Sequence, residues 1–328
     1  MCGDIVTTSS NGMHAPKKIL VVGDLILDVF HHGVFIGKSL SHAQTPVALA
    51  QSSVYTWGGA GFLVRNILAL GGKVSFISAL GTDEFAKRAN RFTHPRLKKL
   101  FLKIPHKPTT VKQRFWIGEK KVLNWHQFDN AFLSNTFART LLAHVRTELS
   151  STNKVVIADY RHGLLSPELA KKIVDMCTRA QVPFYIDSQI SYNHTGNHMW
   201  YKGASLFCLN LKEARSVDRR FTPQKPEASL VRLQKKLRVQ TIVVKLGAQG
   251  SIALIGKEYV KTRAHAVREI DATGAGDAFI GALVLGESSL THKDLERANI
   301  WAALSTTKIG TILPLLSEFK THLKKHRH

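Results

Sequence analysis

The sequence predicts an α/β fold with a doubly wound, mostly parallel β-sheet and a small antiparallel β lid. Along most of the chain, short runs of aliphatic and β-branched residues alternate with helical segments, a pattern typical of parallel sheets covered by helices. Two regions, near residues 30–57 and 110–128, instead show short alternating segments, which indicate strands outside the main sheet. With 328 residues, the chain is long enough for one large domain of this kind.

The strands of the main sheet are predicted from apolar, β-branched runs of four to eight residues. The first run, KKILVVGD, ends in Gly-Asp, and ligands of open α/β sheets collect at such carboxyl ends. Turn residues separate the later runs, and a hairpin follows the last of them. Strands are expected at residues 17–24, 74–80, 154–159, 183–187, 206–209 and 241–246, with the hairpin at 250–255 and 258–261.

The helices are predicted from amphipathic segments with start and stop signals. Gly71 and Gly72 end the first helix. Ser166 is expected to cap a later helix, with Pro167 in its first turn. Helices are expected at residues 60–70, 138–149, from 166 onward, at 274–285 and at 293–308.

The two ends of the chain read differently from the rest. Residues 1–16 have neither a basic segment nor an apolar core, so we expect a disordered leader and not a signal peptide. The folded domain is expected to span residues 17–320, followed by a basic tail at 321–328. No run of 18 apolar residues occurs, so no membrane span is expected.

The cysteines point to a reducing compartment. Cys2, Cys177 and Cys208 are odd in number and lack the spacing of a metal or redox motif. We therefore expect free thiols and a cytoplasmic protein.

The chain is strongly basic, with 46 Lys and Arg against 23 Asp and Glu and a net charge of +23. Such a charge attracts polyanions, which keeps a nucleic-acid-binding protein open as an alternative. The basic residues are scattered, however, apart from runs at 96–99, 235–236 and 320–328, and no zinc-finger spacing or basic helix occurs. Nucleic acid is therefore not the expected partner, and a basic surface also suits an enzyme with anionic substrates.

The segment DATGAGDAF, residues 271–279, is the most informative part of the sequence. Gly274 and Gly276 allow the backbone to approach a ligand. The N–H groups at the start of the following helix form an anion site. Asp277 falls in the first turn of that helix, where it can simply complement the helix dipole or accept a proton beside a bound phosphate.

This segment resembles the D-T-x-G-A-G-D signature of the ribokinase-like (PfkB) carbohydrate kinases, which transfer phosphate from ATP. The resemblance implies that Asp277 is the catalytic base and that the amides of Gly274, Ala275 and Gly276 form the anion hole. Asp271 and Thr273 would shape the loop on the ATP side. Ala272 departs from the usual Thr.

Two further motifs resemble the nucleotide side of that family. Asn210 and Glu213 match N-x-x-E, whose glutamate organises the water shell of Mg²⁺, although the same spacing also forms a helix cap. Lys245, Gly247 and Gly250 match K-x-G-x-x-G, a turn that passes close to ATP in the family and that alone is a generic hairpin turn.

The sugar side resembles the family in a series of short motifs that occur in the family's order. By the resemblance, strand-end carboxylates and a Gly-Gly pair contact the sugar, and each motif alone would be an ordinary turn or cap. The expected substrate residues are Asp24, Asp28, Gly58, Gly59, Phe62, Arg114, Asp159 and Asp187.

Within the family, residues 18–315 resemble the bacterial heptose-7-phosphate kinases of lipopolysaccharide-core synthesis. Those enzymes phosphorylate the anomeric hydroxyl, and many carry a fused nucleotidyltransferase domain, for which we expect no room here. Phe62 replaces their sugar-binding Asn, Val29 and Asn124 replace two Arg, and Asp-Ser-Gln at 187–189 replaces Asp-Pro-Lys. The substrate is therefore expected to be heptose 7-phosphate or, as the alternative, a different sugar or sugar phosphate.

The resemblance also implies that the lid covers the sugar and pairs two subunits into a homodimer. Two alternative functions are less compatible with the sequence. A dinucleotide-dependent enzyme would need G-x-G-x-x-G after the first strand, which is missing. A non-catalytic nucleotide-binding protein would have no need of Asp277 and its two loop glycines.

Overall fold

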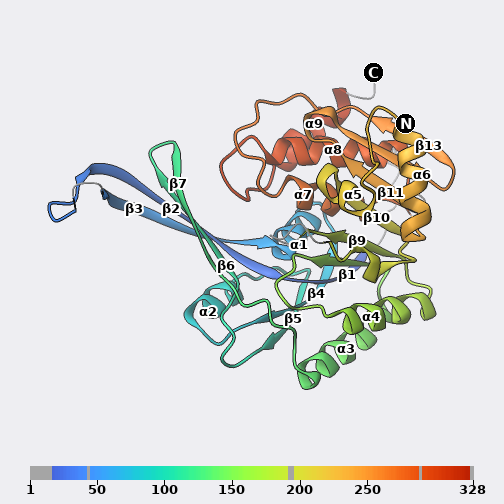
Figure 1. The fold of residues 1–328 in the computed structure, drawn as a ribbon, viewed down its shortest axis with the longest axis horizontal. Helices are drawn as coiled ribbons and strands as arrows, with labels where there is room; N and C mark the ends of the chain where they lie inside the picture. Colours follow the sequence, from blue (N-terminus) through green and yellow to red (C-terminus); the bar gives the residue numbers. More distant parts are fainter. Residues whose placement is uncertain (1–16, 43–44, 191–195, 288–289, 326–328) are drawn as a thin grey trace, which may run out of the picture.

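The computed structural model describes residues 17–42, 45–190, 196–287 and 290–325, and Figure 1 shows its α/β architecture. The predicted leader at 1–16 lies outside the described residues. Within them, a nine-stranded sheet has the order β13-β12-β11-β10-β9-β8-β1-β4-β5. The pairs from β11 to β5 are parallel and the β11–β12–β13 meander is antiparallel. The predicted fold class is confirmed.

The main-sheet strands lie close to their predicted positions, and an edge strand joins them. Their bounds are β1 Lys18–Gly23, β4 Lys73–Leu80, β5 Leu97–Lys103, β8 Lys154–Asp159, β9 Phe184–Ser188, β10 Leu206–Asn210, β11 Thr241–Lys245, β12 Ser251–Ile255 and β13 Glu258–Thr262. The basic run at 96–99 falls largely on β5 at the edge of the sheet, where lysines discourage pairing with other strands.

Helices cover both faces of this sheet (Figure 1). One core layer includes residues of α1, α7 and α8, and the other includes residues of α3, α4 and α6. Side chains of β1 alternate between the layers, with Val21 in the first and Val22 in the second. The helices are α1 Ala60–Ala69, α2 Glu84–Asn90, α3 Asn135–Leu149, α4 Pro167–Arg179, α5 Leu211–Val217, α6 Pro226–Leu237, α7 Ala275–Leu283, α8 His292–Ser305 and α9 Leu316–Lys325, with short 3-10 turns η1 His198–Tyr201 and η2 Gly247–Gln249.

The predicted basic tail begins too early, because α9 continues to Lys325. The ring of Phe319 lies 5.0 Å from that of Trp301 in α8, which ties α9 to the core. Residues 326–328 lie outside the described part of the chain.

The lid is a second sheet that projects from the body (Figure 1). Its strands are β2 Leu25–Lys38, β3 Pro46–Gly59, β6 Val111–Ile117 and β7 Lys120–Gln127, in the order β3-β2-β6-β7. The prediction of purely antiparallel strands is wrong for the central pair, since β2 and β6 run parallel. Both strands leave the main sheet in the same direction, and each returns through its own antiparallel hairpin partner.

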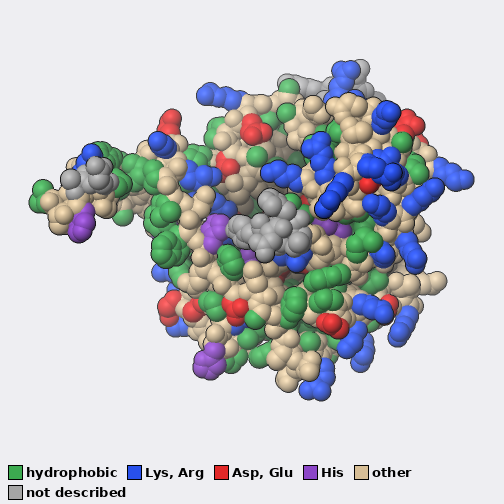
Figure 2. Space-filling model, in the orientation of Figure 1, with side chains coloured by type: hydrophobic (Ala, Val, Ile, Leu, Met, Phe, Trp, Pro, Cys, Tyr) green, Lys and Arg blue, Asp and Glu red, His purple; other side chains and the backbone are tan. Residues whose placement is uncertain are grey.

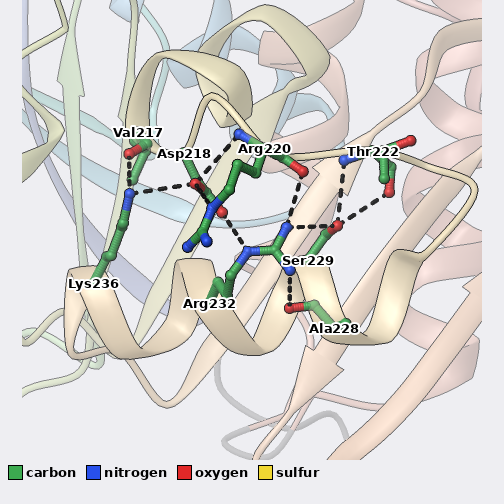
Figure 3. A network of polar contacts seen from close by, with 8 residues as sticks. All are labelled: Val217, Asp218, Arg220, Thr222, Ala228, Ser229, Arg232 and Lys236. Carbon is green, nitrogen blue, oxygen red and sulfur yellow. Dashed lines mark hydrogen bonds and ion pairs between the residues drawn. The ribbon is translucent and has the colours of Figure 1, made fainter.

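A buried carboxylate joins the end of α5 to α6 (Figure 3). The Asp218 side chain is 2% exposed and accepts hydrogen bonds from Arg232 Nε at 2.7 Å and Lys236 Nζ at 3.3 Å. Although burial opposes ionisation, these donors lower the pKa of Asp218 below its ordinary value. The basic run at 235–236 thus lies on α6 and serves in part to anchor that helix.

Arg232→Met should lower the free energy of unfolding by about 2 kcal/mol, because it leaves a buried carboxylate short of a partner. Since the folded-state pKa of Asp218 is depressed, the contribution is present at neutral pH and is lost as the pH falls through that pKa. Urea unfolding at pH 7 and pH 3 measures the difference. Exposed Lys235→Met is the control, and an equal loss in both variants would contradict the assignment.

Candidate active site

Five neighbouring strands of the main sheet have their carboxyl ends on the same side of the sheet. The residues there are Asp24 after β1, Asp159 of β8, Asp187 of β9, Asn210 of β10 and Lys245 of β11. Asp277, at the start of α7, lies beside these strand ends. Polar residues from strands that are far apart in sequence are thus brought together at one helix terminus.

The loop before α7 has the conformation of an anion site. Gly274 precedes the helix in the left-handed region, with φ of 82°, and a Cβ on it would lie 2.6 Å from the Phe62 ring. The N–H of Ala275 donates to Ala272 O at 3.2 Å, so this predicted member of the anion hole is engaged within the turn. Among the described residues no acceptor faces the N–H groups of Gly276 and Asp277.

Asp271 fixes the shape of this loop. One carboxylate oxygen accepts from Thr273 N at 3.1 Å and from Thr273 Oγ1 at 2.7 Å. The other accepts from Gly310 N at 2.9 Å. Asp271 and Thr273 therefore fix the backbone conformation of this loop.

Asp277 is a buried carboxyl group in an acidic environment. Burial and the nearby charge of Asp187 raise its pKa to about 8, although a hydrogen bond from Tyr160 and the charge of Lys245 oppose the rise. The Tyr160 hydroxyl donates to Asp277 Oδ1. A carboxyl group with a pKa near neutrality is suited to general-base work.

Lys245 provides positive charge beside the acids. Its Nζ lies 3.3 Å from Asp187 Oδ1, and 3.2 Å from where a Cβ on Gly276 would be. Although burial opposes the charged form, Asp187 and, among others, Glu213 and Asp277 raise the pKa of Lys245 above its ordinary value. The ammonium group therefore stays charged next to the loop that precedes α7.

Glu213 and Asn210 form a helix cap at the start of α5. Glu213 N donates to Asn210 Oδ1 at 2.9 Å, and Asn210 N donates to Glu213 Oε2 at 2.7 Å. The same carboxyl group faces the site, where burial and Asp187 raise its pKa to about 7 against the charge of Lys245. The cap thus holds a carboxylate at the acidic cluster, so the capping and site interpretations are compatible.

Asp28, one of the predicted substrate residues, pairs with a residue of the lid. Arg114 Nη1 lies 2.7 Å from Asp28 Oδ1, with the guanidinium over the Phe30 ring at 5.1 Å. A Cβ at Gly58 would lie 2.0 Å from Asp28 Oδ2, so any side chain there would displace this carboxylate. Gly59 has φ of 54° and precedes α1. The lid and the Gly-Gly pair thus converge on one carboxylate.

Phe62 does not line an open pocket. Its side chain is fully buried and packs beneath Gly274 in the loop before α7, with the Arg65 guanidinium 5.6 Å from the centre of its ring. The sequence resemblance predicts Phe62 to be a substrate-binding residue, whereas in the structure its ring supports the loop before α7.

The carboxylates of Asp24 and Asp159 also accept hydrogen bonds from other parts of the protein. The Asp24 carboxylate accepts the backbone amides of Tyr160, His162 and Leu164. Asp159 accepts from Tyr201 Oη at 2.5 Å, from Arg161 N at 2.9 Å and from Asn197 Nδ2. Both are predicted to contact the sugar, and in the structure their oxygens accept from the loop after β8 and, for Asp159, also from Asn197 and Tyr201 at η1.

Sequence reasoning missed Tyr160 and Lys112. Tyr160 directly follows the predicted strand end at Asp159, so the carboxyl-end rule could have found it. Lys112 of β6 lies near Asp28 and Asp277. Burial lowers the pKa of Lys112, although the negative charges of these two acids oppose that effect. Only its place in the lid could have singled it out.

Several solved structures of kinases share the fold of this chain. A structure titled as a putative ribokinase from Agrobacterium tumefaciens has a TM-score of 0.76 at 18% identity, covering 95% of this chain and 99% of the other. Escherichia coli phosphofructokinase-2 has a TM-score of 0.79 at 15% identity, covering 96% and 100%. Arabidopsis thaliana ribokinase, solved with ribose and ATP, has a TM-score of 0.69 at 18% identity, covering 94% and 99%. The fold is that of ribokinase-like kinases.

Residues 16–318 match the pfkB family carbohydrate kinases, and the chain belongs to this family. The family that the resemblance predicted is therefore confirmed. "Bifunctional protein HldE" of Campylobacter curvus is 29% identical over 94% of the chain, and its counterpart in Bradyrhizobium diazoefficiens is 26% identical over 95%. The chain spans 65% and 64% of the lengths of these two proteins. Among the described helices, none has the length and apolar character needed to cross a bilayer.

Proposed function

We propose that the chain transfers the γ-phosphoryl group of ATP to a hydroxyl of a sugar or sugar phosphate, with Asp277 as the general base. The observation that carries this proposal is the start of α7. There a buried carboxylate lies beside the amides of Gly276 and Asp277, for which the described residues offer no acceptor, and a charged lysine lies next to the same turn. This arrangement supplies proton acceptance and phosphate stabilisation at one place.

The acceptor hydroxyl would approach the free oxygen of Asp277 and lose its proton to it. As the new oxygen–phosphorus bond forms, the bond between the γ-phosphorus and the bridging oxygen of ATP breaks, and ADP leaves. The amides of Gly276 and Asp277 would hold the transferred group. Lys245, 3.3 Å from Asp187, would offset negative charge as it gathers on the phosphates.

Mg²⁺ fits the donor set at this edge of the sheet. Glu213 and Asp187 are hard oxygen donors close enough to shift the Glu213 pKa. Among the described residues no three His, Cys, Asp or Glu side chains are placed to hold a metal directly. Glu213 would therefore hold the ion through water, and the ion would supply positive charge that offsets the charge of the ATP phosphates.

Heptose 7-phosphate, phosphorylated at the anomeric hydroxyl for a surface-glycan or lipopolysaccharide precursor, is the substrate we propose. The sequence resemblance and the similarity to HldE proteins support it. Arg114 and Lys112 of β6 place two cations beside Asp28, which suits a substrate that already carries phosphate. The departures at Phe62 and Val29 keep a different sugar or sugar phosphate as the alternative.

ADP release with a panel of acceptors tests this function. Heptose 7-phosphate, the free heptose, ribose and fructose 6-phosphate are each incubated with Mg-ATP. We expect the largest kcat/KM with heptose 7-phosphate. A higher value for another acceptor would support the alternative substrate, and no ADP release above background with any sugar would contradict the kinase proposal.

We further propose that the lid pairs two copies of the chain. Its strands expose large apolar side chains far from the body, as the hydrophobic surface on the projecting arm in Figure 2 shows. Trp125 is 60% exposed, and an apolar surface of this kind marks an interface. The other large exposed residues on the lid are Val34, Phe35, Ile36, Leu49, Val54, Tyr55, Val122 and Leu123.

Trp125→Glu should convert the dimer to a monomer, because it places a charge within the apolar lid surface. Light scattering coupled to size exclusion measures the mass. Met199→Glu is the control, since Met199 is 46% exposed on η1, outside the lid. A monomeric wild type, or a dimer in both variants, would contradict pairing through the lid.

A further inference from the structure

The two oxygens of the Asp277 carboxylate are not equivalent. Oδ1 accepts the hydrogen bond of the Tyr160 hydroxyl. No described residue donates to Oδ2. The phenol is itself buried, at 6% exposed, so water cannot readily replace it. One oxygen of the base is thus held by the protein, and the other is left for an acceptor hydroxyl.

Tyr160 is in turn held by Asp24 at the end of β1. The Asp24 carboxylate accepts Tyr160 N at 2.9 Å, Leu164 N at 3.3 Å and His162 N at 3.4 Å. Arg161 has a left-handed φ of 65°, a conformation that lets successive amides converge on one anion. This clamp fixes the backbone from which the phenol reaches Asp277.

We propose that Tyr160 is a positioning residue that orients the base through Oδ1 and stabilises its carboxylate form, and that Asp24 acts on the base by holding Tyr160. This inference rests on the proposed role of Asp277 as a base and extends it to the loop after β8. It also explains why Asp24, expected to bind sugar, directs its oxygens at backbone amides.

The surroundings of Asp277 leave few other groups that favour its ionised form. Asp187 of β9 and Asp28 of β2 disfavour it, whereas Lys245 of β11 and, from its electrostatic coupling, Lys112 of β6 favour it. Burial, with the charge of Asp277, raises the pKa of Tyr160 well above its ordinary value. The phenol therefore stays protonated, and donates its hydrogen bond, at the pH values at which Asp277 titrates.

Tyr160→Phe tests the role with little change in shape. Without the donor, the acid limb of the kcat/KM profile should move to higher pH by about one unit. Tyr201→Phe is the matched control, because its phenol donates at 2.5 Å to a different buried carboxylate, Asp159. We expect that control to lower the melting temperature without moving the acid limb. An unmoved limb in Tyr160→Phe would overturn the proposal.

Carbon-13 NMR titration of the Asp277 carboxyl carbon gives the same answer without any turnover, with Asp277→Asn to assign the signal. If the wild type phosphorylates no sugar, the kinase proposal fails, and the titration still decides whether Tyr160 sets the midpoint. Asp24→Asn should raise the midpoint in the wild-type background and leave it unchanged when residue 160 is Phe. An equal shift in both backgrounds would contradict the coupling through Tyr160.

Discussion

Asp277→Asn is expected to lower kcat by a factor of about 10²–10⁴ while the fold and ATP binding persist. Asn has nearly the same shape but cannot accept the proton of the sugar hydroxyl. Because the pKa of Asp277 is raised to about 8, kcat/KM of the wild type should increase with pH and level off above that value. Steady-state ADP release across pH 6–10 measures both effects, and near-normal turnover in the variant would exclude Asp277 as the base.

The same substitution should stabilise the protein. A carboxyl group whose folded-state pKa lies above its unfolded value makes folding less favourable as pH rises from about 4 to about 8. Asn removes this dependence, so the melting temperature of the variant should exceed that of the wild type, increasingly so up to pH 8. Asp218→Asn is the control of opposite sign, because the pKa of Asp218 is lowered; it should lose stability and keep turnover.

The strands of the sheet and the glycine turn before α7 could be predicted because their sequence signals are local. Aliphatic runs such as Ile19–Val22 are fully buried on both faces of β1, and burial on both faces needs no alternation. Gly274 has a left-handed φ and contacts Phe62, so only glycine suits that position. Such requirements appear directly in the residue type.

Other features depend on tertiary contacts that no local pattern encodes. Asp24 follows β1 just as a ligand-binding carboxylate would, and only the fold brings the amides of residues 160–164 to it. The direction of β6 relative to β2 depends on how the chain leaves β5. Phe62 is at a position predicted to bind the sugar, but its ring packs under Gly274 in the loop before α7. For Asp24 and Phe62 the sequence identifies the residue, but the contacts of its side chain depend on the tertiary structure.

Lys245→Met should reduce turnover by about 10²–10³, the usual cost of losing one group that stabilises charge on the transferred phosphate. It should also lower stability by about 3 kcal/mol, because Asp187 loses its partner at 3.3 Å and the buried acids Glu213 and Asp277 lose a neighbouring positive charge. Activity assays and urea unfolding measure the two effects separately. Lys245→Arg keeps the charge and should retain more of both.

Neutralising both partners separates the catalytic from the structural contribution of Lys245. In Lys245→Met/Asp187→Asn the unpaired charge at residue 187 is gone, so much of the lost stability should return. Turnover should stay low, because neither new side chain can offset charge on the phosphates beside Gly276. If turnover recovers together with stability, Lys245 serves only to neutralise Asp187, and stabilisation of the transferred group must come from the amides of α7 and the metal ion.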